Sequence, residues 1–159
     1  GDSLLEYATI NKINLGKRDY YNDKEFSVVE LYPYDFIEKK ETYDLLQFHF
    51  KTNDKNKIIQ SISGIVSYKN NMKNCYIDLE NNYNDVVSIF DNWKNLGKET
   101  YDHNNGEGKI TDYVLENDSR DEIQIACYDY FNDDVDEDHF RISLRTFEYR
   151  VWLLTKAYK

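Results

Sequence analysis

Alternating apolar and polar positions predict a β-hairpin in the middle of the chain. Apolar residues recur at every second position over residues 44–51 and again over 58–68, and the polar turn TNDKNK separates the two runs. Such alternation is typical of strands with one buried face, and a short polar turn joins two of them as a hairpin. The buried positions expected in the first strand are Leu46, Phe48 and Phe50.

A long amphipathic segment follows the hairpin. Its apolar residues recur at steps of three and four, the spacing of one helix face. They are Met72, Cys75, Tyr76, Leu79, Tyr83, Val86, Val87, Phe90 and Trp93. We therefore expect a helix over residues 70–93 that packs its apolar stripe on the hairpin.

The ends of the chain carry helical signals. Ser3 and Glu6 form a capping box, in which each side chain bonds the backbone of the other residue, and Thr9 is a second candidate cap that allows a break in the helix. The last predicted helix spans residues 148–158. Its apolar stripe comprises Phe147, Val151, Leu154 and Tyr158.

The remaining pattern predicts loops at residues 15–24 and 95–108 and four more strands. The strands are expected over 26–32, 110–116, 122–131 and 139–147. Runs of adjacent strands favour a single α+β domain over residues 1–159, with an antiparallel sheet of about six strands, a long central helix and a C-terminal helix packed on one face. We expect the other sheet face to be partly open. Its predicted residues are Gln47, His49, Ser61, Ser63, Tyr128, His139, Arg141, Ser143 and Arg145.

Composition limits the function. The chain has 159 residues, of which 40% are hydrophobic, which favours a folded globular protein. Its 30 acidic and 20 basic residues give a net charge of -10, which disfavours binding to nucleic acids and anionic membranes. No apolar run reaches the ~18 to 20 residues of a membrane span.

Two arginines on the predicted open face suggest a binding site. Arg141 and Arg145 lie four residues apart in one strand of an acidic protein, and guanidinium groups bind anions well. The alternative is that they pair with neighbouring acids. With His49 and Tyr128 they form our candidate ligand-binding residues for a partner protein or small ligand, in a non-enzymatic domain without cofactor or metal.

The two cysteines leave two interpretations open. Cys75 on the helix stripe and Cys127 in a strand could form a disulfide, which would stabilise the fold by about 2 to 4 kcal/mol. They could equally be two buried thiols. The chain begins at Gly1 without methionine, which indicates either a processing site or a cloning remnant.

An alternative function is a serine esterase. The first four residues spell the GDSL nucleophile block, with Ser3 as nucleophile, and Asp136 and His139 match the Asp-x-x-His block. Against it, no strand precedes Gly1, the Gly-x-Asn-Asp block is missing and the capping box already explains Ser3. The strand order also lacks a parallel sheet to hold such a site.

Two further alternatives are weaker. The acidic run over residues 132–138 has the first ligand spacings of a calcium loop, but His139 and Arg145 stand where its glycine and last glutamate belong. A solvated turn explains it better. A structural or assembly protein could use a strand edge or the aromatic residues around Phe147 and Trp152.

The segments GDSLLEY, SISGIVSYKNNMKNCY and IACYDYF resemble short uncharacterised proteins of planktonic marine bacteria whose mature chains open near GDSLL. The resemblance covers most of the chain, although Tyr128 stands where that pattern has a different residue. It implies a signal peptide that has been removed, a disulfide between Cys75 and Cys127, and a periplasmic or secreted location. It implies no activity.

Overall fold

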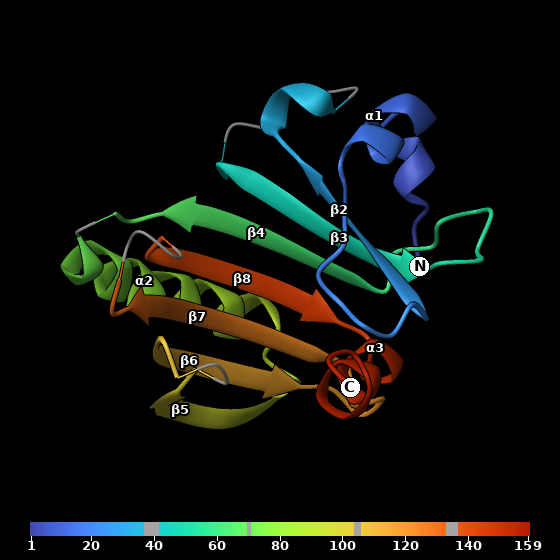
Figure 1. Ribbon diagram of the computed structural model, residues 1–159. Coiled ribbons are helices and arrows are strands. Elements are labelled where there is room, and N and C mark those ends of the chain that lie inside the picture. The colour runs from blue at the N-terminus through green and yellow to red at the C-terminus, as the bar shows by residue number, and fades with distance from the viewer. Residues whose placement is uncertain (37–41, 70, 104–105, 133–136) are drawn as a thin grey trace. The chain divides into compact units, whose positions relative to one another are not determined.

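The computed structural model describes residues 1–36, 42–69, 71–103, 106–132 and 137–159. The chain divides into two compact units: unit 1 comprises residues 1–64 and 144–159, and unit 2 comprises residues 65–143. The strands belong to an eight-stranded sheet in the order β1-β2-β3-β4-β8-β7-β6-β5 (Figure 1).

The strands are β1 (Lys17–Arg18), β2 (Phe26–Leu31), β3 (Leu45–Lys51), β4 (Ser61–Ser67), β5 (Lys94–Asp102), β6 (Gly108–Glu116), β7 (Glu122–Tyr130) and β8 (His139–Arg145). The helices are α1 (Ile10–Leu15), α2 (Met72–Ile89) and α3 (Phe147–Thr155), with the 3-10 turns η1 (Leu4–Glu6) and η2 (Pro33–Asp35).

The predicted fold of about six strands around a long central helix is wrong. The structure is mainly one eight-stranded antiparallel sheet, and two of its three helices are short. The two strands that the sequence pattern missed, β1 and β5, are the two edges of the sheet. An edge strand can be polar on both faces because it packs against little, so it has no apolar alternation to detect.

Strand β5 shows how such an edge forms from a segment expected to be a loop. Almost all of its residues are exposed, but they pair in register with β6 from Lys94 to Asp102. The register shifts between Asn95 and Gly97, and Gly97 has φ +97°, a conformation that glycine adopts without steric cost. The Asn95 side chain accepts a hydrogen bond from the Gly97 amide at 2.9 Å, which fixes this bulge.

The N-terminal capping box is confirmed. The Leu5 amide donates to Ser3 Oγ at 3.2 Å, and Glu6 accepts from the Ser3 amide at 3.4 Å. The helix breaks after Glu6, because Thr9 caps a separate helix, α1.

The sheet of unit 1 is covered on both faces, which corrects the expectation that all helices pack on one face. Alternate residues of β2 point to opposite sides: Val29 belongs to the core beneath η1 and α1, whereas Val28 packs against Tyr149 and Trp152 of α3. The apolar positions predicted in β3 all lie in the first of these cores. They are Leu46, Phe48 and Phe50.

Helix α3 packs with the face opposite to the predicted one. Tyr149 and Trp152 are buried, and the indole Nε1 of Trp152 donates to Asp23 Oδ1 at 2.7 Å. In contrast, Leu154 is 73% exposed and Tyr158 is 62% exposed. Both stripes of this helix are apolar, so spacing alone could not identify the buried one.

Gly64 in β4 permits a close approach, as its position within a strand suggested. The neighbouring group is the Tyr43 ring rather than another backbone, since a Cβ at Gly64 would lie 2.6 Å from that ring.

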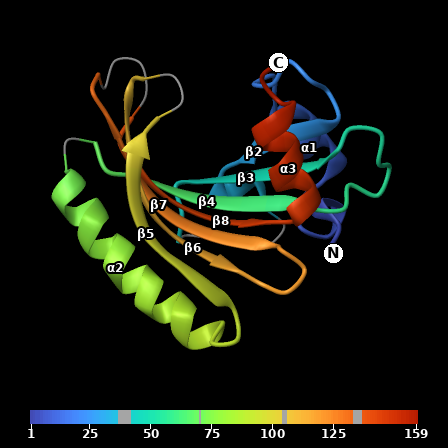
Figure 2. The same ribbon diagram turned by 90° about the horizontal axis from the view of Figure 1, so that it is seen from below.

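Unit 2 is organised by helix α2, which packs against β7 and its neighbours (Figure 2). Cys75 and Leu79 of α2 are fully buried against Ile125 and Cys127 of β7. A disulfide joins Cys75 to Cys127, with Cα atoms 6.1 Å apart, so the predicted pairing is confirmed. The helix is therefore attached to one face of the sheet covalently as well as by apolar packing.

Polar contacts at the rim of this helix add to the packing. Glu80 accepts hydrogen bonds from Lys98 Nζ at 2.5 Å and from the Tyr113 hydroxyl at 2.8 Å. Burial, followed by the hydrogen bond to Glu80, raises the pKa of Tyr113 to about 12. Tyr113 also stacks on Tyr83, with ring centroids 3.8 Å apart. These contacts link α2 to the outer strands β5 and β6.

Within the described residues, no helix has the length and apolar character needed to cross a membrane.

We predict that the double variant Cys75→Ala/Cys127→Ala loses about 4 kcal/mol of unfolding free energy. The disulfide closes a loop between residues 52 positions apart, which restricts the unfolded chain. Urea denaturation followed by circular dichroism measures the loss. An unchanged midpoint, or free thiols that react in denaturant without reductant, would contradict the disulfide.

The orientation of α3 gives a second prediction. Trp152→Ala should cost about 3 to 5 kcal/mol because it removes a buried aromatic side chain. Leu154→Ala, on the exposed side of the same helix, should stay within about 0.5 kcal/mol. The same urea experiment compares them, and equal losses would show that the helix packs differently.

Candidate ligand-binding site

The side of the unit 2 sheet away from α2 carries the candidate site. Ile125 and Cys127 face the helix, so the alternate residues of β7 point the other way. In the register of β6 and β7, Asp112 pairs with Ala126 and Ile110 with Tyr128, which places their side chains on the same side. We call this side the polar face. Its side chains include Tyr101, Asp112, Gln124, Tyr128, Tyr130, His139 and Arg141.

Aromatic rings gather around Tyr128 on the polar face. The Tyr128 and His139 rings are stacked, with centroids 4.5 Å apart and planes 12° apart. The ring centroid of Tyr130 lies 5.5 Å from that of His103 and 6.0 Å from that of His139. Arg141 places its guanidinium carbon 5.3 Å from the centroid of Tyr128. We call these five residues the Tyr128 cluster.

The protonation state of His139 follows from its contacts. Its Nδ1 lies 2.8 Å from the carbonyl oxygen of Glu137, so Nδ1 carries the proton and donates it. Burial, with a further contribution from the charge of Arg141, lowers the pKa of His139 to about 4. The ring is therefore neutral at pH 7, and its buried Nε2 is an acceptor without a hydrogen-bond partner among the described residues.

Arg141 is the cation of the cluster. It packs on the Tyr128 ring, but within the described chain no carboxylate forms an ion pair with it, and its buried Nε has no hydrogen-bond acceptor. A buried donor without an acceptor costs about 1 to 3 kcal/mol, and more when the group is charged. A ligand that supplies an acceptor would recover that free energy.

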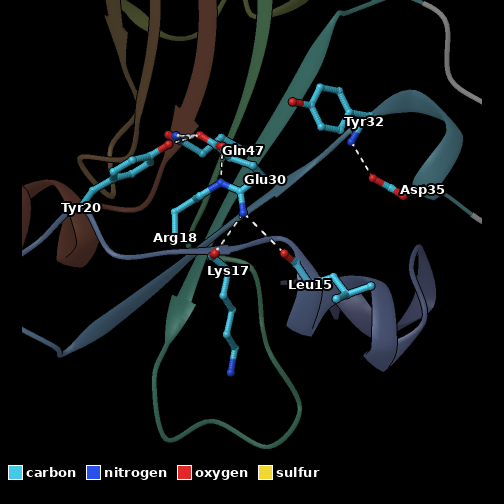
Figure 3. A network of polar contacts seen from close by, with 8 residues as sticks. All are labelled: Leu15, Lys17, Arg18, Tyr20, Glu30, Tyr32, Asp35 and Gln47. Atoms are coloured by element: carbon cyan, nitrogen blue, oxygen red, sulfur yellow. Dashed lines mark hydrogen bonds and ion pairs between the residues drawn. The ribbon is translucent and has the colours of Figure 1, made fainter.

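Arg18 in unit 1 shows the ordinary arrangement for comparison (Figure 3). Its Nε donates to Glu30 Oε2 at 2.9 Å, and its Nη1 donates to the carbonyl oxygen of Lys17 at 3.1 Å. The other oxygen of Glu30 accepts from the Tyr20 hydroxyl at 2.7 Å and from Gln47 Nε2 at 3.1 Å. Glu30 neutralises this arginine within its own unit, whereas no carboxylate of the described residues pairs with Arg141.

A second polar group lies on the same face: Asp112 pairs with Ala126, and Gln124 lies four residues from Tyr128 along β7. Asp112 Oδ2 accepts hydrogen bonds from the Tyr101 hydroxyl at 2.9 Å and from Gln124 Nε2 at 2.5 Å. Gln124 Nε2 also lies 3.3 Å from the Tyr101 hydroxyl. Both amide hydrogens of Gln124 are thus engaged, while its buried Oε1 has no partner in the part of the chain that is described.

His49, a predicted site residue, lies in unit 1 and is only 2% exposed. The Tyr21 hydroxyl lies 3.0 Å from His49 Nε2 and 3.2 Å from the Tyr149 hydroxyl, so the imidazole belongs to a buried network under α3. The sequence pattern predicted correctly on which side of the strand the His49 side chain lies, but it did not predict that this side is buried. The same holds for several other residues expected on an open face, which are buried: Gln47, Ser61, Ser63, Tyr128 and Ser143.

Arg145, the second predicted arginine, also belongs to unit 1. It is half-buried at the end of β8, and its charge acts on Tyr149. Burial raises the pKa of Tyr149 well above its ordinary value, and Arg145 opposes that rise. Of the four predicted ligand-binding residues, the structure brings Tyr128 and Arg141 into contact.

The residues of the esterase alternative are engaged elsewhere. The Ser3 hydroxyl donates to the carbonyl oxygen of Asn56 at 2.5 Å, and Asp2 accepts from the Tyr7 hydroxyl at 2.9 Å. His139 directs its Nδ1 to Glu137, and its Nε2 has no bond to Ser3. Asp136 lies outside the described residues.

Most of the acidic run predicted as a turn, residues 133–136, also lies outside the described residues. Asp138 at its end is buried and accepts a hydrogen bond from the Tyr130 amide at 2.8 Å, so it has a structural role. Among the described side chains, no group of His, Cys, Asp or Glu is arranged to hold a metal ion.

Four residues of the polar face were not predicted from the sequence: Tyr101, Asp112, Gln124 and Tyr130. Tyr101 lies in β5, which was expected to be a loop, and the other three occupy alternate positions of strands whose apolar residues face α2. Polar residues at such positions are usually solvated, so alternation identifies their side of the sheet but not their mutual contacts. The hydrogen bond between Asp112 and Gln124 depends on the register of β6 and β7, which only the structure shows.

We predict that His139 makes stability fall in mildly acidic solution. The pKa of His139 is 6.5 in the unfolded chain and about 4 in the folded chain. The contribution of the neutral ring to the free energy of unfolding is therefore complete above pH 6.5 and is lost as the pH falls toward 4. The loss is of the order of 3 kcal/mol. His139→Phe keeps an aromatic ring but cannot titrate, so urea midpoints between pH 4 and 7.5 should change less in this variant. If the urea midpoints of the native protein and of His139→Phe changed equally with pH, the assignment of this pH dependence to His139 would be contradicted.

Comparisons with protein-family models, curated proteins and solved structures found no match, so the geometry of the polar face carries the functional argument alone.

Proposed function

We propose that the protein is a small exported binding domain that holds an organic carboxylate on Arg141, with the flat body of the ligand against the rings of the Tyr128 cluster. The observation that carries the proposal is a guanidinium group on the Tyr128 ring with neither a carboxylate partner nor an acceptor for its buried Nε in the described chain.

The chemistry of the cluster favours a carboxylate. A guanidinium group presents parallel N–H donors that match the two oxygens of a carboxylate, and each charge-assisted hydrogen bond is stronger than a neutral one. Four aromatic rings, each with its centroid within 6.4 Å of at least two of the others, offer flat apolar contact beside that charge. Specific ligand sites commonly combine such an apolar lining with a few polar groups.

The cluster is suited to binding rather than to catalysis. Nucleophilic catalysis requires a base in contact with a nucleophile, and His139 Nε2 contacts none among the described residues. A neutral imidazole with a fixed Nδ1 proton can instead accept one hydrogen bond from a hydroxyl or amide of a ligand.

The disulfide supports an exported location for this domain. Buried structural disulfides form and persist mainly in oxidising compartments, such as the periplasm or the extracellular space. Cys75 and Cys127 are both fully buried, and no free cysteine is present. This agrees with the periplasmic or secreted location that the sequence resemblance implies.

The proposal is tested with 3-phenylpropanoate as a probe. Isothermal titration should detect binding to the native protein, and Arg141→Gln should weaken it at least tenfold because the paired charge is lost. Arg18→Gln is the matched control, since it removes the same charge from an arginine that already has a carboxylate partner. It should leave the affinity unchanged.

Two further comparisons make the result specific. The uncharged 3-phenylpropanamide should bind much more weakly than the carboxylate. Arg141→Lys keeps the charge but not the planar donor pair, so its affinity should lie between those of the native protein and Arg141→Gln. Equal binding by Arg141→Gln and the native protein, or no binding by either, would contradict the proposal.

A further inference from the structure

We propose that the ligand of the polar face is an extended zwitterion, whose carboxylate binds Arg141 and whose ammonium group binds at Gln124 beside Asp112. This inference rests on the proposed function and adds a second charged group to the ligand. The expected ligand is about as long as a short peptide and, like such a peptide, carries an ammonium group at one end and a carboxylate at the other.

The orientation of Gln124 is the first step of the argument. Its amide nitrogen donates to Asp112 Oδ2 at 2.5 Å and lies 3.3 Å from the Tyr101 hydroxyl, which itself donates to Asp112. With both hydrogens used in this triangle, the amide cannot turn without losing them. Its oxygen is therefore held as an acceptor, and it is buried without a partner in the described chain.

The second step is the charge beside that acceptor. The Asp112 side chain is only 3% exposed and directly contacts the Gln124 amide. A nearby carboxylate favours a cationic donor over a neutral one, because a buried charge attracts strongly in an environment of low dielectric constant. An ammonium group provides up to three donors and the complementary charge.

The third step is the distance between the two ends. Gln124 and Tyr128 lie four residues apart on the same side of β7, which separates their Cα atoms by about 13 Å. The Arg141 guanidinium packs on the Tyr128 ring, so the cation and the acceptor are on the order of 10 Å apart. A free α-amino acid is too short to reach both, whereas two or three extended peptide residues, at about 3.3 to 3.6 Å each, are long enough.

Three buried polar atoms on this face have no partner among the described residues: Gln124 Oε1, His139 Nε2 and Arg141 Nε. Buried polar atoms normally find partners, so such a group of orphans requires an explanation. An extended zwitterion accounts for two of them, since it supplies a donor to Gln124 and an acceptor to Arg141.

The experiment compares two probes that share one scaffold. 3-Phenylpropanoate carries only the carboxylate, and 3-(4-aminomethylphenyl)propanoate adds an ammonium group at the far end of the ring. Isothermal titration of the native protein should show at least tenfold tighter binding of the zwitterion. The comparison needs no variant, so it does not depend on the stability of an altered protein.

Gln124→Met then locates the ammonium group. Methionine has a similar volume but no amide oxygen, so the gain from the ammonium group should disappear while 3-phenylpropanoate binds as before. Gln47→Met, the matched control, changes a glutamine of unit 1 and should keep the full difference in affinity between the two probes. Arg141→Gln should weaken the binding of both probes at least tenfold.

Every other outcome contradicts either the zwitterion inference or the proposed function. If both probes bind the native protein equally, the zwitterion is overturned and the carboxylate site stands. If the gain persists in Gln124→Met, the ammonium group binds elsewhere and the inference is again overturned. If neither probe binds, the proposed function fails together with the inference.

Discussion

The disulfide between Cys75 and Cys127 is the constraint on which unit 2 depends. It attaches α2 to the central part of β7, between Gln124 and Tyr128, on the side where the apolar residues of the strand pack against the helix. Since side chains of a strand alternate, fixing Ile125 and Cys127 under the helix forces Gln124 and Tyr128 to the opposite side. The bond needs no contribution from the polar face itself, so that face is free to carry groups that do not stabilise the fold.

Such groups are what the polar face contains. Arg141 Nε and Gln124 Oε1 are buried without a partner in the described part of the chain, and this stabilises the fold little, because each loses its bonds to water on folding. Arg18, which is held by Glu30, shows that the same chain can neutralise an arginine where no ligand is needed. The difference between these two arginines is the physical basis for assigning the polar face to binding.

The sequence predicted those parts of the molecule in which burial and periodicity coincide. Leu46, Phe48 and Phe50 alternate in a buried strand, and the capping box of Ser3 is a local signal, so both were found. The edge strand β5 was missed because neither of its faces is buried, and its pairing with β6 depends on backbone hydrogen bonds that leave no side-chain pattern. The buried side of α3 was predicted wrongly because Trp152 and Leu154 are both apolar, and only the position of β2 distinguishes them.

Part of the site could be predicted from the sequence. Tyr128 and Arg141 could be assigned to one side of the sheet by alternation, and the charge balance drew attention to the arginine. His49 satisfied the same rule, but it lies beneath α3, whose packing the periodicity did not reveal. Asp112 and Gln124 meet only through the register of two strands, and no local pattern encodes a register.

The central claim is that Arg141 meets the carboxylate of a ligand through its buried Nε–H. Nuclear magnetic resonance of the arginine Nε–H groups during a titration with 3-phenylpropanoate observes this bond directly. The account predicts that the Arg141 resonance moves downfield and exchanges more slowly with solvent as the probe binds, while the Arg18 resonance stays in place. A stationary Arg141 resonance at saturating probe would contradict the account, wherever else in the protein shifts occurred.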